Sequence, residues 1–331
     1  MIADLAANAI DSNPRRAFAS PEAVICLMTF HRPEMLRLTL LSLADQIDAP
    51  RFAVIVVEND AARRAGAAVA AEFFSARRLA GVCVVVAAPG NCSAANRAFS
   101  EARRRFPEAP YILMIDDDEV ASPHWLAAIV AAARAQNVDI VGGPALPRFP
   151  KGAPRGALEH PIYWSAYSKS GPVPIIYGSG NFLIRREAWA RLANPDFDLR
   201  YNFLGGGDAD FFARCRRAGL TFYWEQGARV DEIVPAKRLG IRWMLQRGLR
   251  IGAVNYSVEM GAAASWLGRL RPALKSAAIV PLAFLRAARL TLAGKSPMVA
   301  LHPIIIAAGR ILAAFGIEPE QYRLSGRSTG S

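Results

Sequence analysis

The chain has 331 residues, 53% of them hydrophobic and 21% charged, so it can bury the core of one large domain with an appendage, or of two domains. Its four cysteines lie apart without a CxxC pair, which excludes a zinc signature and a disulfide framework and favours a reducing compartment. Most of the net charge of +12 follows residue 232, where fourteen Lys and Arg face three Asp and Glu. Few aromatic residues stand between these basic residues, so we expect no nucleic-acid partner.

The first half of the chain alternates short apolar runs with helical patterns. The runs suit strands buried on both faces and cover residues 24–28, 53–57, 82–86, 111–115 and 138–141. Helices are predicted from Pro33 to about Ile47, over about 61–80 and 94–106, and from Ser122 onward. This order predicts an α/β sheet with helices on both faces.

The second half is less regular at first and then helical. Residues 142–180 are rich in Gly and Pro and predict an irregular stretch. Helices are expected near 186–192 and 211–218, and a strand at 221–224. Beyond it the composition is basic and helical to the end.

An aspartate triplet directly follows the apolar run 111–115. Asp116 and Asp118 lie two residues apart, so an extended backbone points both side chains to the same face. Mg²⁺ commonly uses one or two carboxylates together with phosphate oxygens, so the pair is a candidate cation site beside a nucleotide. A solvated acidic turn is the alternative, because Asp is favoured in turns.

Polar residues follow the other predicted strands as well. Thr29 and Arg32 follow the first strand, Glu58 and Asp60 the second, and Asn91 the third. Ligands of open α/β sheets bind outside the carboxyl ends of the strands. The sequence therefore predicts a pocket at this edge of the sheet.

Several short motifs occur in a defined order along the chain. They are Thr29-x-x-Arg32, Glu58-Asn-Asp60, Asn91 through Asn96, Asp116-Asp117-Asp118, Gly178-Ser-Gly-Asn181, Gly206-Gly-Asp208-Ala-Asp210, Glu232-Ile-Val-Pro-x-x-Arg238 and Arg247-x-x-Arg250-x-Gly252. Together they resemble the family 2 glycosyltransferases, and the last two resemble the bacterial exopolysaccharide branch of that family. The resemblance spans about residues 23–252. It implies a GT-A fold, which is Rossmann-like with a mixed, mostly parallel sheet, and inverting transfer from a nucleotide-sugar, expected to be a UDP-sugar.

The resemblance also implies roles for individual residues. Asp118, assisted by Asp116, would bind Mn²⁺ or Mg²⁺, which neutralises charge on the leaving diphosphate without needing a proton. Contacts with the nucleotide-sugar are implied for Thr29, Arg32, Glu58, Asp60, Asn91, Asn96, Asp116 and Asp117. Weaker candidates for acceptor or diphosphate contacts are Asn181, Asp210, Glu232, Arg238 and Arg247.

Asp208 matches the general base of the family, which takes the proton of the acceptor hydroxyl. Backbone amides at the start of the following helix would stabilise its ionised form. A simple N-cap of that helix is the alternative. Many relatives have a His after the final strand and a Glu before the base; Val230-Asp-Glu232 and Gly207 stand in these places here. Either Glu232 or an arginine such as Arg238 or Arg247 would then serve the diphosphate, or the metal would be held less tightly.

The expected organisation has four parts. Residues 1–22 are an N-terminal lead without the apolar core of a signal peptide, 23–141 the nucleotide-sugar-binding half, 142–252 the acceptor-binding, catalytic half, and 253–331 a helical membrane-associating region. In the last part, the apolar runs 277–285 and 298–309 are too short to span a bilayer. Basic residues at their ends, namely Arg286, Arg289, Lys295 and Arg310, fit helices lying on an anionic membrane. A helical hairpin packed on the main domain is the alternative.

We therefore expect a metal-dependent hexosyltransferase-like enzyme, peripheral at the cytoplasmic face of the inner membrane. It would extend a glycan or lipid-linked saccharide in polysaccharide or cell-envelope biosynthesis. A sugar nucleotidyltransferase is one alternative, but residues 29–33 lack the glycine-rich loop usual there. A non-catalytic nucleotide- or glycan-binding membrane-surface protein is the other. The presence of both Asp118 and Asp208 argues against it, because binding alone needs no base.

Overall fold

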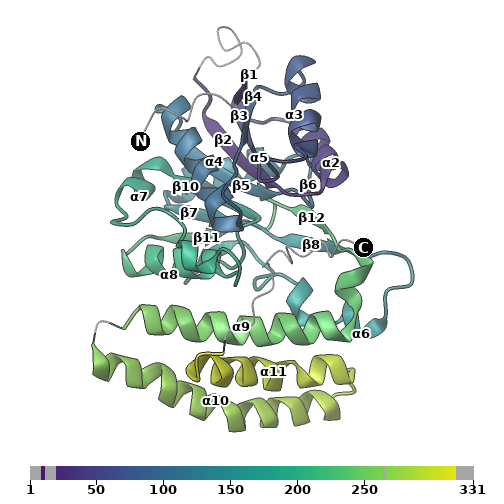
Figure 1. Ribbon diagram of the computed structural model, residues 1–331, viewed down its shortest axis with the longest axis vertical. Coiled ribbons are helices and arrows are strands. Elements are labelled where there is room, and N and C mark those ends of the chain that lie inside the picture. The colour runs from purple at the N-terminus through teal and green to yellow at the C-terminus, as the bar shows by residue number, and fades with distance from the viewer. Residues whose placement is uncertain (1–8, 12–19, 264, 318–331) are drawn as a thin grey trace, which may run out of the picture. The chain divides into compact units, whose positions relative to one another are not determined.

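The computed structural model of the chain describes residues 9–11, 20–263 and 265–317 (Figure 1). Their contacts divide the chain into two compact units. Unit 1 contains the described residues up to Arg148 together with Trp164–Phe197 and Phe211–Ile233, and unit 2 contains Phe149–Tyr163, Asp198–Asp210 and the described residues from Val234 onward. The functional halves expected from the sequence divide the chain differently and stay predictions.

Unit 1 is built on a nine-stranded sheet in the order β1-β4-β3-β2-β5-β10-β7-β11-β9. The strands are β1 (Ala9–Asp11), β2 (Ala23–Thr29), β3 (Phe52–Glu58), β4 (Gly81–Val85), β5 (Tyr111–Asp116), β7 (Ile140–Gly142), β9 (Gly171–Val173), β10 (Asn181–Arg185) and β11 (Phe222–Trp224). The central strands β4, β3, β2 and β5 are parallel, whereas β10 pairs antiparallel with β5. The predicted mixed sheet with a parallel centre is confirmed. β1 adds an antiparallel edge strand inside the segment expected to be a loose lead, most of which lies outside the described residues.

A second, three-stranded sheet lies next to the aspartate triplet in the chain. It consists of β6 (Glu119–Ala121), β12 (Val230–Ile233) and β8 (Ala145–Arg148), with β12 in the middle. β6 begins directly after Asp118, and Glu119 pairs with Glu232 across β6 and β12. This pairing brings a segment more than a hundred residues away to the end of β5.

Helices cover both faces of the large sheet, as predicted (Figure 1). Alternate residues of β2, such as Ile25 and Leu27, pack in one core with residues of α2 (Pro33–Ala44), α3 (Ala65–Ser75) and α5 (Trp125–Gln136). On the other face an aromatic cluster joins β10 to α4 (Asn91–Arg105), α7 (Arg186–Ala190) and α8 (Gly207–Arg217). Its rings are Phe99, Phe182, Trp189, Phe211 and Phe212.

Unit 2 is largely helical, as its composition predicts. Its long helices are α9 (Ile241–Gly261), α10 (Trp266–Leu292) and α11 (Pro297–Ala314), and its short ones are α6 (Arg155–Leu158), η1 (Pro161–Tyr163), η2 (Leu199–Tyr201) and η3 (Ala236–Leu239). α11 contacts both α9 and α10. The backbones of α9 and α11 touch, because a Cβ on Gly252 would lie 2.1 Å from the Ile306 carbonyl oxygen and one on Gly309 2.0 Å from that of Leu249. Larger residues at these two glycines would force the helices apart.

Candidate active site

Asp116 is the last residue of β5, Asp117 and Asp118 form the turn to β6, and two side chains at the end of β2 hold this turn. Thr29 Oγ1 donates a hydrogen bond of 2.9 Å to Asp117 Oδ2. Arg32 Nη1 lies 3.0 Å from Asp117 Oδ1 and 2.8 Å from Asp118 Oδ2. Ile233 N donates to the Asp118 carbonyl oxygen at 2.8 Å, which ties the turn to β12. The predicted grouping of Thr29, Arg32 and the triplet is therefore present, and the buried Asp117 carboxylate is already engaged as an anchor.

A fourth carboxylate, Glu119, joins the triplet and was not predicted. It is buried, and its Oε2 accepts the Asp116 N–H at 3.0 Å. Gly180 leaves room for it, because a Cβ on Gly180 would lie 2.3 Å from Glu119 Oε1. The sequence signal that could have found this residue is the pair of an acidic residue directly after the triplet and a glycine one position before Asn181.

Burial and mutual repulsion change the acidity of this carboxylate cluster. Burial, and then the charges of Asp118 and Asp117, raise the pKa of Asp116 to about 8. Burial raises the pKa of Asp117 to about 6, although the Arg32 guanidinium opposes the rise. The pKa of Glu119 is raised well above its usual range by burial and by the charge of Asp116. The cluster thus concentrates more carboxylate than Arg32 neutralises.

A divalent cation fits this set of donors. Carboxylate oxygens are the ligands that Mg²⁺ and Mn²⁺ prefer, and an added positive charge would favour the ionised forms of Asp116 and Asp118. Among the described residues no group of three or more His, Cys, Asp or Glu is arranged to hold a metal by itself. Substrate phosphate oxygens and water molecules would complete the coordination.

Asp60 and His31 form a second polar pair, at the ends of β3 and β2. His31 Nε2 lies 2.8 Å from Asp60 Oδ2, and the His31 ring stacks on Phe30 with centroids 3.9 Å apart. Asp60 Oδ1 accepts the N–H groups of Ala62 and Arg63 at 3.2 and 3.1 Å. Burial alone would raise the pKa of Asp60, but these amides and His31 lower it on balance, so the carboxylate stays ionised. His31, which was not predicted as a site residue, adopts φ 57°.

Glu58 has a different position from the one expected of a nucleotide contact. Its buried carboxylate accepts the N–H groups of Asp60 at 2.9 Å, Gly66 at 2.7 Å and Ala67 at 3.2 Å. These bonds satisfy the free amides at the start of α3 and hold the Asp60 loop. They also explain why α3 starts at Ala65 rather than near residue 61, since Arg64 before it has a left-handed φ of 54°. We therefore treat Glu58 as a positioning residue.

Two predicted asparagines also serve the scaffold. Asn96 exchanges two hydrogen bonds with the backbone of Phe197, at 2.7 and 2.9 Å. The buried Asn181 amide accepts from Trp125 Nε1 at 2.8 Å and donates to the Ala228 carbonyl oxygen at 2.7 Å. These bonds give both residues a structural role, and their predicted substrate contacts stay predictions.

Two candidates stand at the starts of helices. Asn91 is the first residue of α4 and is exposed. Asp208 lies in the first turn of α8, which begins at Gly207, and it is half-buried. A first-turn carboxylate is stabilised in its ionised form by the helix dipole. Both positions are compatible with the predicted contacts.

Glycines shape the turn in front of Asp208. Gly205 and Gly206 have φ of 78° and 89°, and a Cβ on Gly206 would lie 2.3 Å from Val254 Cγ1. A side chain there would meet both backbone strain and a clash. The buried Asp210 donates its backbone N–H to the Gly206 carbonyl oxygen at 3.1 Å. The turn at Gly205 and Gly206 therefore sets how Asp208 and Asp210 stand in the first turn of α8.

Three weaker candidates lie in or near the final strand and α9. Glu232 pairs with Glu119 in the small sheet and its charge helps to raise the pKa of Asp116; its predicted contact with acceptor or diphosphate stays a prediction. The Arg238 guanidinium lies 5.9 Å from the centre of the Trp243 ring, and Arg247 is half-buried on α9. Diphosphate contacts of the two arginines stay predictions.

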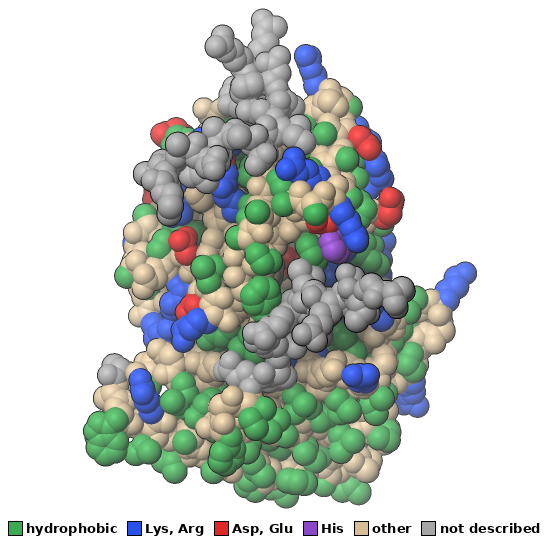
Figure 2. Space-filling model, viewed as in Figure 1, with side chains coloured by type: hydrophobic (Ala, Val, Ile, Leu, Met, Phe, Trp, Pro, Cys, Tyr) green, Lys and Arg blue, Asp and Glu red, His purple; other side chains and the backbone are tan. Residues whose placement is uncertain are grey.

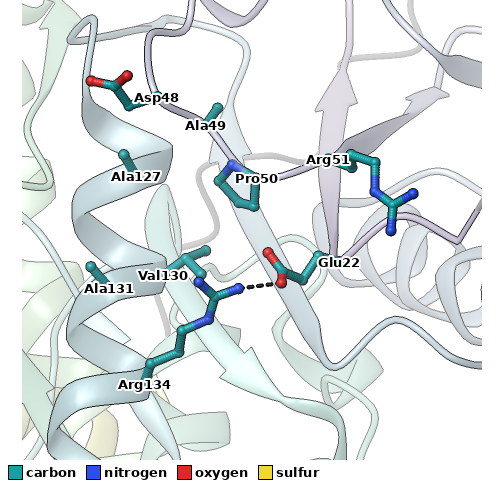
Figure 3. Close-up of a pocket in the computed structure, with 9 residues that line it drawn as sticks. All are labelled: Glu22, Asp48, Ala49, Pro50, Arg51, Ala127, Val130, Ala131 and Arg134. Carbon is teal, nitrogen blue, oxygen red and sulfur yellow. Dashed lines mark hydrogen bonds and ion pairs between the residues drawn. The ribbon is translucent and has the colours of Figure 1, made fainter.

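Unit 1 also has a pocket of about 500 Å³ at the opposite edge of the large sheet (Figure 3). Glu22 and Arg51, directly before β2 and β3, line it together with α5, and an ion pair joins Glu22 to Arg134. The pocket lies at the amino ends of the parallel strands. The carboxylate cluster is at their carboxyl ends, where ligands of such sheets bind.

Known proteins match this chain in both sequence and fold. The sequence model of Glycosyl transferase family 2 matches residues 24–192. The succinoglycan biosynthesis protein ExoM of Rhizobium meliloti (strain 1021) is 31% identical over 235 residues, which are 70% of this chain and 73% of that protein. The mannosyltransferase PcManGT from Pyrobaculum calidifontis, solved with GDP-Man and Mn²⁺, has a TM-score of 0.60 at 18% identity, over 94% of this chain and 90% of that one. The structure of residues 1–349 of S. aureus TarS has a TM-score of 0.53 at 13% identity, over 91% of this chain and 93% of that one. The two structural likenesses show a shared fold.

Proposed function

Because the chain belongs to glycosyl transferase family 2 and has the GT-A fold, we propose that it transfers a sugar from a nucleotide-sugar to a saccharide acceptor with inversion. One observation supports this most strongly. The carboxylates of Asp116, Asp118 and Glu119 gather at the carboxyl end of β5, where burial raises the pKa of Asp116 to about 8. Such a cluster is suited to a cation and to the diphosphate that the cation binds.

On the donor side, Asp116 and Asp118 would hold Mn²⁺ or Mg²⁺, which supplies positive charge to the departing diphosphate. Arg32, 2.8 Å from Asp118, fixes the carboxylate that would face the cation. Glu232 supplies charge where many relatives have a His. Asp60 would accept hydrogen bonds from the base or ribose, because it stays ionised at the neighbouring strand end.

On the acceptor side, Asp208 would remove the proton from the attacking hydroxyl. A general base must be ionised and within reach of its substrate, and the first-turn position of Asp208 supports the first condition through the helix dipole. Inversion follows if the hydroxyl attacks from the face opposite the diphosphate.

The reaction belongs to bacterial polysaccharide or cell-envelope synthesis in this proposal. The support is the likeness to a succinoglycan biosynthesis protein. The acceptor would be a glycan or lipid-linked saccharide reached from the cytoplasmic face of the inner membrane. The donor is proposed to be a UDP-sugar, and a panel of UDP-, GDP- and dTDP-sugars tests this choice.

The decisive experiment measures acceptor-dependent release of nucleoside diphosphate by the purified chain. Asp208→Asn should keep donor binding while transfer falls by about 10²- to 10⁴-fold, since general-base catalysis contributes that much. Glu187→Gln, which changes a first-turn carboxylate of α7, is the matched control and should leave transfer unchanged. Equal turnover in Asp208→Asn would refute the base, and full activity with EDTA would refute the metal. Release of pyrophosphate would favour a nucleotidyltransferase.

A further inference from the structure

The helix with the most apolar sequence is not the most exposed one. Within the described residues, α11 is the helix that is long and apolar enough to cross a membrane, with a mean hydropathy of 1.6 over 18 residues. It packs against both α9 and α10, however. Arg310 on α11, expected from the sequence at a membrane surface, is only 2% exposed. Its guanidinium bonds Glu259 Oε2 of α9 at 2.7 Å and Ser276 Oγ of α10 at 3.1 Å. Spanning a bilayer would therefore require α11 to leave a buried ion pair.

The exposed apolar surface of unit 2 lies on α10. Eight residues, three or four positions apart and all exposed, form a continuous line that we name the α10 stripe: Trp266, Leu270, Leu274, Ala277, Pro281, Leu285, Ala288 and Leu292. Trp266 is 72% exposed, Leu274 69% and Leu285 59%. Residues at this spacing share one face of a helix. Figure 2 shows the hydrophobic side chains crowded over this helical part of the chain.

The opposite face of α10 is the packed one. Its buried residues are Pro272, Ser276, Ala283 and Ala287, which lie between the stripe residues in the sequence. The helix therefore has an inner side that packs within unit 2 and an outer side whose central line of residues is apolar. Exposed apolar areas of this extent mark interaction surfaces.

The charges on α10 have one sign. The helix contains no Asp or Glu and carries five exposed basic residues, namely Arg269, Arg271, Lys275, Arg286 and Arg289. Arg271 and Arg289 directly follow Leu270 and Ala288, so they border the stripe. A second copy of this chain would bring these like charges together across the contact. Lys275 Nζ already lies 2.5 Å from Glu259 Oε1 of α9, and anionic lipid headgroups would meet the other four with opposite charge.

We propose that the α10 stripe docks the protein on an anionic phospholipid bilayer, with α10 lying in the plane of the interface. An amphipathic helix in this position buries its apolar face about 5–10 Å into the boundary between headgroups and acyl chains, with its basic residues at the headgroups. The 27 residues of α10 would lie along about 40 Å of membrane. This surface would bring the enzyme to lipid-linked saccharides, and in this respect the inference rests on the proposed function. The binding of α10 to lipid does not depend on that function.

Vesicle flotation of the full chain tests the proposal. The protein should float with vesicles of phosphatidylglycerol and phosphatidylcholine, and much less with phosphatidylcholine alone. Leu274→Glu/Leu285→Glu should lower the partition coefficient at least about tenfold, because two charges would enter the apolar layer. The matched control, Leu38→Glu/Ile47→Glu, changes two residues of unit 1 that are 45% and 49% exposed and should float like the wild type. Equal flotation of the two variants, with both folded by circular dichroism, would overturn the proposal.

Two further measurements separate the other outcomes. Brominated lipids should quench Trp266 in the bound protein, and Trp266→Phe should lose that component; identical quenching in both proteins would overturn the docking geometry. If the stripe variant instead turned a dimer into a monomer with vesicle binding unchanged, a second copy would cover the stripe and the proposal would be wrong. Transfer to a water-soluble saccharide should persist in the stripe variant. Vesicle binding without any transfer in the wild type would defeat the proposed function while leaving the docking surface intact.

Discussion

The contact between Gly180 and Glu119 allows a direct test of how the carboxylate cluster is built. In Gly180→Ala the new Cβ would lie 2.3 Å from Glu119 Oε1 and 2.7 Å from its Cδ, where ordinary contacts begin at 3.4 Å. The carboxylate must therefore shift by about 1 Å. Such a shift breaks the 3.0 Å bond that Glu119 Oε2 accepts from the Asp116 N–H.

The expected loss of stability follows from the Asp116 N–H, which would be left without its acceptor. A buried donor without its acceptor costs about 1–3 kcal/mol, so we expect Gly180→Ala to lower the free energy of unfolding by about 2 kcal/mol. Alanine itself is not unfavourable, since replacing a compatible glycine stabilises by about 0.4–1 kcal/mol through the unfolded chain. Gly240→Ala is the matched control, because Gly240 has φ −76° and a Cβ added there would have no atom within 4 Å. It should be neutral or slightly stabilising.

Urea denaturation of four proteins completes the test. They are the wild type, Gly180→Ala, Glu119→Ala and the double variant. Once the Glu119 carboxylate is gone, Gly180→Ala should cost almost nothing, so the coupling free energy should be about 2 kcal/mol. Mn²⁺ binding, followed by electron paramagnetic resonance, should weaken in Gly180→Ala and not in Gly240→Ala. Additive effects of the two substitutions would show that the carboxylate does not fill the space at Gly180 and would refute the reasoning.

Three other predictions concern stability. Glu58→Gln should lower the free energy of unfolding by about 1–2 kcal/mol, because it weakens three bonds to backbone amides; the exposed Glu72→Gln on α3 is its control, and equal effects would contradict the capping role. In metal-free buffer, thermal stability should fall as the pH rises from about 5 to 8, because the folded pKa of Asp116, about 8, exceeds its unfolded value and the folded state binds more protons in that interval. Asp116→Asn should flatten this profile, and a flat wild-type profile would be inconsistent with the buried cluster. Arg310→Met should lower the free energy of unfolding by about 1–2 kcal/mol, because Glu259 and Ser276 lose their buried partner although Lys275 still pairs with Glu259, and the folded protein should still bind vesicles. Unchanged stability would argue against the pair.

Local patterns were enough to place the main elements of unit 1. Runs of Val, Ile and Leu identified β2 through β5, because a strand buried on both faces must be apolar at successive positions. The position of the aspartate triplet at the end of β5 followed from the same runs. The ends of helices were predicted less accurately. The start of α3 depends on hydrogen bonds from its amides to Glu58, and this residue lies on β3, outside the helix.

The engagement of individual side chains depended on contacts between distant parts of the chain. Asn181 and Asn96 belong to motifs that resemble substrate contacts, yet Trp125 and Phe197 engage their amides. Glu119 became part of the cluster through the pairing of β10 with β5 and of β12 with β6. A sequence motif shows which polar side chains are present. Hydrogen bonds to distant parts of the fold determine which of these side chains remain able to bind a ligand.

The C-terminal helices show most clearly what the sequence predicts and what only the folded structure determines. Composition alone predicted that this part of the chain is helical, apolar and basic, and among its described helices α11 is the one apolar enough to cross a membrane. In the folded chain, however, the more exposed apolar helix is α10. Glycines let α11 pack closely on α9, and Arg310 of α11 pairs with Glu259, whereas the apolar residues of α10 face outward. Hydropathy is a property of one segment, but burial depends on which surfaces its neighbours offer. For this reason the exposed apolar face could be located only in the folded chain.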